Sequence, residues 1–503
     1  MRPAHILILL TALMGTTWLT TLVDDGLGLD WTANVTRNWE QYGFTNLHGK
    51  LVVNPGGYEA VAHPQYYAGH RPASLYPLYF IHHLTGGLNL DFLPFYLIVA
   101  AVVSLSIWQM LGRGPIAFWF AVTLILSPGY IRWQTTQDPN LAAVMWGYPF
   151  SVVAFALLQK SRLKPAEWLL LGAATALYSA INWSAAFVHA MLFMALLLHP
   201  RVSRRNLLAY ASVAATVGLL VLSASVASKM TNAAGQHAPP SSLFQSYCWG
   251  NQGYGVDLTT KTAIMRLTAV NLMGLLPVLM LLGWLVWRKN AFRRSKIGLL
   301  FLVPLVVPLL EMTALRNYFG HHPWMSCNFV LLGLVLAIVT WQANQTGQPD
   351  KAAQPVKLPW QIAALAGLLL YGSAVLEFYH IHNAAEINLA KFLRAQTSRA
   401  TTIAINPDTD PELATMIELR LPELFDRNVI PANIKTNAPA PIVLLTAVAS
   451  PPAGHLIARS QATGGSPLME KMLAWYSRTI AHRRAGDKLD FADNYYLYEY
   501  PAR

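Results

Sequence analysis

Long apolar runs separated by short polar loops repeat along residues 4–379 of the chain. A helix needs about 20 apolar residues to cross the hydrocarbon core of a bilayer, so runs of this length predict transmembrane helices. The pattern predicts an all-α polytopic membrane protein with about eleven spans. The expected spans are 4–23, 91–112, 115–131, 141–159, 166–182, 183–199, 206–228, 267–287, 297–315, 326–343 and 359–379.

Two stretches break this pattern. The loop 24–90 is long and half apolar, and we expect interfacial helices at 33–42 and 75–84 with a turn at 53–57 between them. Beyond the last run, apolar segments alternate with helix-like ones, which is typical of a small α/β domain at 384–503. The expected strands are 401–405, 441–445 and 494–500, and the expected helices 411–425 and 467–482. Residues 1–383 would form the transmembrane domain.

The distribution of charged residues predicts how the protein is oriented in the membrane. Only 12% of the 503 residues are charged, against about 25% in soluble proteins, and the net charge is +12. Lys and Arg collect in alternate short loops, which argues against nucleic acid as a partner and predicts that those loops are cytoplasmic. The N-terminus is then cytoplasmic, and the 24–90 loop and the C-terminal domain lie on the outer face. We expect the inner membrane of a bacterium, with a periplasmic C-terminal domain.

The first run and the cysteines add two smaller expectations. The run at 4–23 lacks the small-residue pattern of a cleavage site, so it is expected to be an uncleaved anchor. Cys248 and Cys327 are the only cysteines, so the chain has no disulfide framework.

Three aspartates lie in the first two outer loops. Asp24 and Asp25 follow the first span, and Asp138 lies in the short loop before the fourth. Carboxylates at a membrane boundary often mark function, and one beside a hydroxyl nucleophile can act as a general base. We therefore expect Asp24, Asp25 and Asp138 to be catalytic. Ordinary solvation and helix capping are the alternative.

Cations on the same face point to an anionic ligand. His70 and Arg71 precede a proline and an interfacial helix, where Arg71 could donate two hydrogen bonds to a phosphate. Arg316 opens a short aromatic loop on the outer side of the ninth span, and a cation there suits a departing phosphate. We expect His70, Arg71 and Arg316 to bind substrate or phosphate. The alternative for His70 and Arg71 is plain contacts to loop carbonyls, and the alternative for the Arg316 loop is an aromatic belt at the membrane interface.

The remaining ligand candidates are His321, His322 and Glu311. The adjacent histidines follow Arg316, and they lack the i, i+4 spacing that places two imidazoles on one helix face. We expect no metal there, with a divalent ion as the alternative, and we expect no other cofactor. Glu311 falls inside the ninth span, and a carboxylate at such a position is a functional hypothesis in itself.

These motifs resemble the C superfamily of integral-membrane glycosyltransferases, and especially the branch with protein O-mannosyltransferases and lipid A aminoarabinose transferases. Members carry an acidic pair, usually Asp-Glu, after the first span, where this chain has Asp24-Asp25. The segments 34–38 and 42–44 match the helix that follows, and Asp138-Pro139 matches the aspartate of the second loop. The His-Pro-Pro segment of many members is altered here to His70-Arg71-Pro72-Ala73. The resemblance covers roughly residues 1–200.

The resemblance implies an inverting transfer of a sugar from a polyprenyl-phosphate donor to a hydroxyl of a glycan, lipid or protein acceptor. Asp24 or Asp25 would be the base, Asp138 would assist it or the acceptor, and Arg316 and Arg71 would stabilise the departing phosphate. Two other functions remain open from the residues alone. A transporter or flippase of an amphipathic substrate would use Glu311, although the chain lacks the internal repeat typical of transporters. A scaffold would use the outer domain to bind partners.

Overall fold

The computed structural model describes most of the helical segments and the core of the C-terminal sheet. The described residues are 3–22, 31–57, 61–62, 64, 72–85, 93–112, 114–131, 139–182, 184–232, 260–289, 300–316, 319, 323–344, 358–381, 384–410, 413, 425–432, 441–447, 449, 455–460 and 495–499. The chain divides into two compact units. The first unit comprises Met1–Thr21, Ala68–Pro77 and Leu93–Leu376, and the second comprises Leu22–Tyr67, Leu78–Phe92 and Glu377–Arg503.

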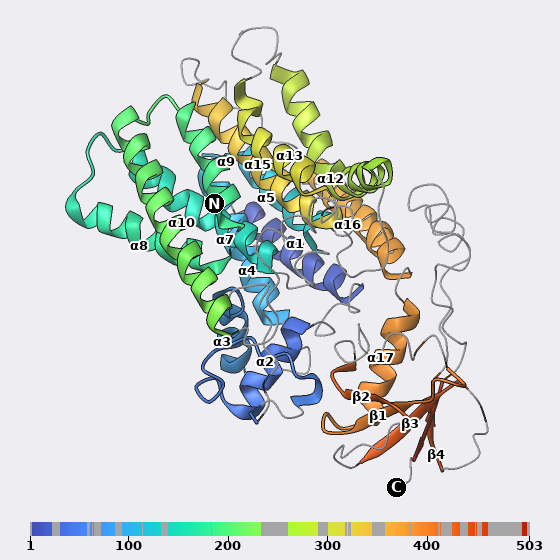
Figure 1. Ribbon diagram of the computed structural model, residues 1–503. Coiled ribbons are helices and arrows are strands. Elements are labelled where there is room, and N and C mark those ends of the chain that lie inside the picture. The colour runs from blue at the N-terminus through green and yellow to red at the C-terminus, as the bar shows by residue number, and fades with distance from the viewer. Residues whose placement is uncertain are drawn as a thin grey trace. The chain divides into compact units, whose positions relative to one another are not determined.

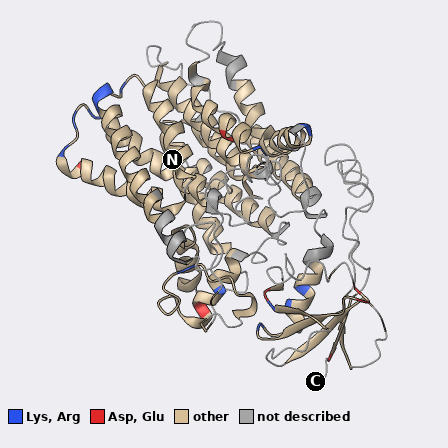
Figure 2. Ribbon diagram, in the orientation of Figure 1, with Lys and Arg blue, Asp and Glu red and all other residues tan. Residues whose placement is uncertain are grey.

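Helices make up the first unit (Figure 1). They are α1 (Pro3–Leu22), α4 (Leu93–Met110), α5 (Pro115–Ile125), α7 (Pro139–Leu158), α8 (Pro165–Ile181), α9 (Ala185–Leu197), α10 (Arg204–Asn232), α12 (Thr260–Lys289), the 3-10 turn η4 (Leu300–Leu305) with α13 (Val306–Ala314), α15 (Pro323–Asn344) and α16 (Leu358–Ile381). Each predicted span coincides with helix, which confirms a mostly helical protein. Figure 2 shows that these helices carry few charged residues among those described.

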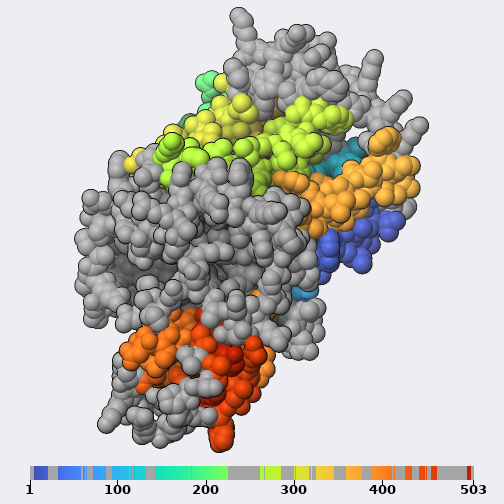
Figure 3. Space-filling model, turned by 90° about the vertical axis from the view of Figure 1, so that its right-hand side faces the viewer, coloured from blue at the N-terminus to red at the C-terminus, as the bar shows by residue number. Residues whose placement is uncertain are grey.

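Length and composition qualify four of the described helices to cross a membrane, at Leu93–Met110, Lys261–Trp284, Met325–Asn344 and Leu358–Leu376. Four shorter apolar helices lie at His5–Thr20, Ala142–Leu158, Ala185–Leu197 and Leu302–Ala314. The number of eleven spans therefore stays a prediction. The outer side chains of α16 suit a lipid neighbour, since Trp360 and Leu370 are 70% and 71% exposed, and the helix is the amber surface of Figure 3.

Close contacts between small residues hold α12 to its neighbours. The hydroxyl of Ser127, just after α5, donates to the carbonyl oxygen of Gly274. Asn271 Nδ2 donates to Ser326 Oγ on α15 at 2.8 Å, and Tyr371 on α16 donates to the carbonyl oxygen of Met273 at 2.6 Å. Helices in a membrane gain little from hydrophobic burial against each other, so small residues and interhelical hydrogen bonds specify their contacts.

The C-terminal part of the second unit is a five-stranded mixed sheet of order β2-β1-β3-β5-β4. Its strands are β1 (Thr402–Ile405), β2 (Asn428–Pro431), β3 (Ile442–Thr446), β4 (Leu456–Arg459) and β5 (Tyr496–Glu499). β1 pairs in parallel with β2 and β3, while β5 runs antiparallel to β3 and β4. Helix α17 (Ala384–Gln396) covers one face, where Leu389 and Leu393 pack with Ile403, Phe425 and Leu445.

Three of the five strands match the predicted ones, and a small C-terminal sheet is confirmed. The bounds 384–503 of a separate domain stay a prediction. β2 and β4 are additional strands. The predicted helix at 467–482 lies outside the described residues, as does most of the one at 411–425.

Residues from the 24–90 loop form the rest of the second unit. The structure confirms both predicted helices, as α2 (Trp31–Tyr42) and α3 (Tyr76–Leu84), and the turn between them, as η2 (Pro55–Gly57). Gly56 and Gly57 adopt φ of 64° and 73°, which only glycine accepts without cost.

Aromatic stacking and hydrogen bonds give this loop a core of its own. The ring of Trp39 meets Phe44 and Tyr79 edge-on at 5.2 and 5.4 Å between centroids. Trp39 Nε1 donates to the carbonyl oxygen of Lys50 at 2.8 Å. Asn38 Nδ2 donates to the carbonyl oxygens of Val52 and Asn54 at 2.8 and 3.0 Å. The loop is therefore folded around α2.

Candidate functional site

The acidic residues predicted to be catalytic fall beside described helices. Asp24 and Asp25 occupy the stretch between the end of α1 at Leu22 and the start of α2 at Trp31, and Asp138 directly precedes the first residue of α7. Asp24, Asp25, Asp138, His70, Arg71, His321 and His322 themselves lie outside the described residues. Their roles stay predictions, and the structure fixes the helices that begin or end next to them.

Arg316 lies where the sequence places it, just beyond the last turn of α13. The helix ends at Ala314, and the N–H of Leu315 donates to the carbonyl oxygen of Glu311 at 2.8 Å. The Arg316 side chain is half-buried. A partly desolvated cation is a stronger partner for a phosphate than one in bulk water.

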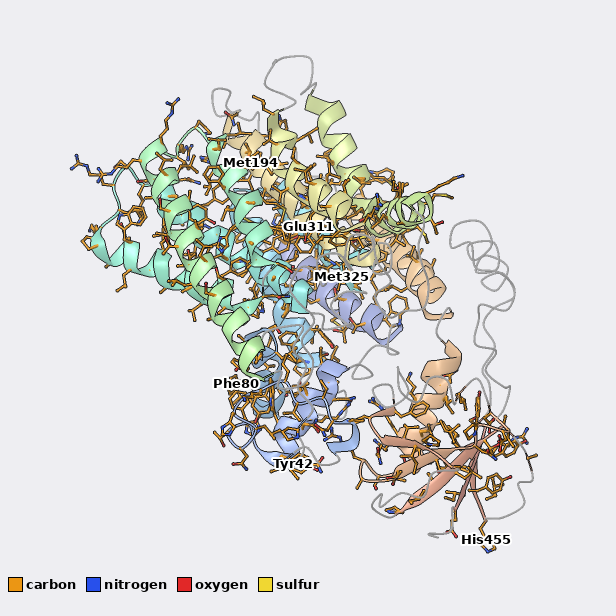
Figure 4. All side chains as sticks on the ribbon, viewed as in Figure 1. Tyr42, Phe80, Met194, Glu311, Met325 and His455 are labelled. Atoms are coloured by element: carbon orange, nitrogen blue, oxygen red, sulfur yellow. The ribbon has the colours of Figure 1, made fainter. Side chains whose placement is uncertain are left out.

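Glu311 is a buried carboxyl among the described residues of the first unit. It projects from α13, which packs against α9 and α15, and is 4% exposed (Figure 4). Its Oε2 atom is buried without a hydrogen-bond partner among the described residues. Buried polar atoms are nearly always paired, so an orphaned carboxyl oxygen inside a membrane bundle calls for a functional or structural reason.

A charged cluster that the sequence did not predict lies in the second unit, at the N-terminal ends of β1 and β2. Its centre is Asp426, whose side chain is 2% exposed. Arg399 donates two hydrogen bonds to this carboxylate, from Nε to Oδ2 at 2.9 Å and from Nη2 to Oδ1 at 3.1 Å. Arg37 Nη1 lies 3.3 Å from Oδ2, and the N–H of Gly56 donates to Oδ1 at 3.1 Å. We call Asp426, Arg399, Arg37 and the Gly56 N–H the Asp426 cluster.

Arg399 also holds α2 directly. Its Nη2 donates to Asn38 Oδ1 at 2.8 Å and to the carbonyl oxygen of Asn34 at 3.4 Å, and its Nη1 donates to Gln41 Oε1 at 2.7 Å. Asn34, Asn38 and Gln41 are spaced i, i+4 and i+7, so they lie on one face of α2. One guanidinium group therefore joins the C-terminal domain to two turns of the loop helix.

Electrostatics favour the charged form of this aspartate. Burial alone would raise the pKa of Asp426, but the guanidinium groups of Arg399 and Arg37 outweigh burial and hold that pKa below its usual value. Next to it, burial lowers the pKa of Arg427 to about 10, and this arginine donates to the carbonyl oxygen of Thr397 at 2.7 Å. Arg427 binds the carbonyl oxygens of Arg394 and Thr397 at the C-terminal end of α17, so these contacts lie within the C-terminal domain.

A second polar contact joins α2 to α3. Glu40 Oε1 and His82 Nδ1 lie 2.5 Å apart, with His82 buried and Glu40 partly exposed. In the parts of the chain that the structure describes, no group of three His, Cys, Asp or Glu side chains is arranged to hold a metal ion. The predicted ligand pair His321-His322 is not among those residues.

No protein-family model matches the chain. No curated protein matches it. Among solved structures it is similar to the arabinofuranosyltransferase AftD from Mycobacteria, with a TM-score of 0.43 and 17% identity over 79% of this chain and 29% of that one. It is also similar to the oligosaccharyltransferase AglB from Archaeoglobus fulgidus, bound to an inhibitory peptide and a dolichol-phosphate, with a TM-score of 0.42 and 12% identity over 86% of this chain and 65% of that one.

The apo form of the Archaeoglobus fulgidus enzyme matches with a TM-score of 0.39 and 11% identity. The chain thus spans less than two thirds of the length of each of these neighbours. The first structure is named as an arabinofuranosyltransferase, and the other two as an oligosaccharyltransferase. None is named for the O-mannosyltransferase or aminoarabinose transferase branch.

Proposed function

We propose that this protein is a membrane glycosyltransferase that moves a sugar from a polyprenyl-phosphate donor to an acceptor hydroxyl at the outer face of the membrane. Asp24 or Asp25 takes the proton of the hydroxyl, and the oxygen attacks the anomeric carbon from the side opposite the phosphate. The bond from that carbon to the phosphate oxygen breaks, and the electron pair leaves with the polyprenyl phosphate. The configuration at the anomeric carbon is therefore inverted.

The other predicted residues serve the two ends of this reaction. Asp138 orients the acceptor or the base. Arg316 and Arg71 stabilise the charge that develops on the departing phosphate, as fixed cations do best where water is excluded. His70, His321 and His322 are further donors to the phosphate or the sugar.

The observation that carries this proposal is the position of the acidic pair. Asp24-Asp25 lies between an apolar helix and α2, and α2 belongs to one compact unit with the C-terminal sheet. Because such a unit lies on one side of a membrane, the loop and the C-terminal domain share a face, as the predicted spans require. An acidic pair at the boundary between an anchor helix and a folded outer unit is where a base would meet a lipid-borne donor.

The test uses purified protein in lipid nanodiscs and a panel of polyprenyl phosphates that carry labelled sugars. We expect release of polyprenyl phosphate by the wild type, and loss of that release in Asp24→Asn or Asp25→Asn and in Asp138→Asn. Asp408→Asn is the matched control, because Asp408 is an exposed aspartate of the C-terminal domain. Full activity in all three acidic variants would refute the assignment.

Glu311 supports a second candidate function, a transporter or flippase of a lipid-linked substrate. Its orphaned carboxyl oxygen inside the helical unit is the kind of group that transport pathways use. Movement of a fluorescent polyprenyl-phosphate sugar across proteoliposomes without sugar transfer, and its loss in Glu311→Gln, would favour this function.

A further inference from the structure

The Asp426 cluster binds together segments that are remote in sequence. Arg37 and Asp426 are 389 residues apart, and Gly56 and Asp426 are 370 apart. Arg399, Arg37 and the Gly56 N–H meet at the Asp426 carboxylate inside the second unit.

The geometry is that of a clamp rather than of a surface ion pair. The guanidinium plane of Arg399 meets both oxygens of Asp426, and its remaining donors reach Asn38 and Gln41. Two-pronged contacts of this kind fix orientation as well as distance. Asn38 is fully buried and is itself bonded to the backbone at Val52 and Asn54, so α2 is held from two sides.

The acidic pair is within short reach of this clamped helix. Asp25 lies six residues before Trp31, the first residue of α2, so the chain allows at most about 21 Å between their Cα atoms. Asp24 and Asp25 are also tied to α1 on their other side. The position of α2 therefore limits how far from it both aspartates can lie.

We propose that Asp426 and Arg399 are positioning residues, through which the C-terminal domain fixes α2 and thereby the Asp24-Asp25 segment for the transfer step. This inference rests on the proposed function. It assigns the C-terminal domain a part in turnover, in addition to any part in binding an acceptor.

The experiment compares Asp426→Asn and Arg399→Lys with the wild-type protein in nanodiscs. Asparagine keeps the shape of aspartate without its charge, and lysine keeps the charge of arginine without its planar fork. We expect kcat to fall about 10- to 100-fold, because small displacements of catalytic groups slow a reaction by such factors. The KM for the donor is expected to stay within about twofold of the wild-type value. Asp426→Glu, which restores the charge, is expected to recover part of kcat.

Two readouts separate positioning from loss of folded protein. Binding of sugar-free polyprenyl phosphate counts the competent molecules, and kcat is expressed per competent molecule. Hydrogen exchange of residues 31–42 is expected to speed up in Asp426→Asn, while exchange in β1 and β3 stays slow. The acidic limb of the pH–rate profile is expected to move, because the environment of the base changes.

Arg427→Lys is the matched control. Arg427 is buried beside Asp426. It donates to Thr397 Oγ1 and to the carbonyl oxygens of Thr397, Arg394, Phe425 and Asp426. This variant is expected to lower the melting temperature without changing kcat per competent molecule or exchange in α2.

The outcomes also separate this inference from the proposed function. Unchanged kcat and an unchanged pH profile in Asp426→Asn, in a protein that Asp24→Asn or Asp25→Asn inactivates, would overturn the positioning role alone. Full activity of all the acidic variants would overturn the glycosyltransferase and the positioning role together.

Discussion

Gly129 and Gly274 cross with their backbones in contact. A Cβ added to Gly274 would lie 3.1 Å from the Cα of Gly129 and 3.2 Å from the sulfur of Cys327. A Cβ on Gly129 would lie 3.2 Å from the Cα of Gly274. Residues just after α5 therefore meet α12 and α15 at a point where a side chain would have to push a neighbouring backbone aside.

Gly274→Leu is expected to destabilise the first unit strongly, because the added side chain would strike the backbone at Gly129, which cannot rotate away. The measurement is the melting temperature of the detergent-solubilised protein. Gly283→Leu is the control on the same helix, since nothing lies within 4 Å of a Cβ there. Equal melting temperatures for the two variants would contradict this description of the crossing.

Gly56→Ala is expected to destabilise the second unit for two reasons. Its φ of 64° costs a non-glycine residue about 1–2 kcal/mol, and the new Cβ would lie 2.6 Å from the carbonyl oxygen of Arg399. Gly112→Ala, in the first unit, gives the first cost alone, because Gly112 has a φ of 85° and open space around it. The measurement is the rate of proteolysis of the unit that carries each substitution. Gly56→Ala should accelerate proteolysis of its unit more than Gly112→Ala does, and equal accelerations would rule out the close approach.

The second unit is expected to lose stability in acid. Because Arg399 and Arg37 hold the pKa of Asp426 below its usual value despite its burial, the carboxylate stabilises the fold above that usual value. This contribution is lost as the pH falls below about 4 and Asp426 takes up a proton. Hydrogen exchange in residues 31–42 between pH 7 and pH 3 measures the loss. Asp426→Asn should exchange faster at neutral pH and depend less on pH, and an unaltered pH dependence would contradict this origin.

Glu311→Leu is expected to raise stability and lower activity together. Burying a polar group without a partner costs about 1–3 kcal/mol, which leucine would recover. The transfer rate should fall if the carboxyl takes part in the reaction, because residues needed for activity often lower the stability of the fold. Melting temperature and polyprenyl-phosphate release are the measurements. Thr313→Leu, at an exposed site on the same helix, is the control. A melting temperature lower than that of the wild type in Glu311→Leu would contradict the prediction.

Local pattern was sufficient for much of the fold. Strong periodicity or turn residues mark several elements in the sequence itself. These elements are the helices α2 and α3, the turn at Pro55–Gly57 and the strands β1, β3 and β5. β2 and β4 were missed because they are edge strands of four residues. In such strands the tertiary contact, rather than the sequence, decides the structure.

The Asp426 cluster could not be predicted in the same way. Arg37, Arg399 and Asp426 are each ordinary charged residues in polar stretches, and only the fold brings them together. A weak signal was present in the buried neighbours, since Asp426 follows Phe425 at the end of a predicted helix and precedes an apolar strand. Asp24, Asp25 and Asp138, by contrast, are singled out by their position beside spans, and both their geometry and their catalytic role stay predictions.

The distance in sequence between Arg37 and Asp426 has a consequence for how the protein is made. A ribosome completes the 24–90 loop long before it reaches Arg399, so the face of α2 formed by Asn34, Asn38 and Gln41 emerges without its partner. Every intervening helix must be inserted before that partner is synthesised. The newly made loop therefore lacks this contact through most of translation, and a chain released early would leave the face of α2 that Arg399 contacts without its partner.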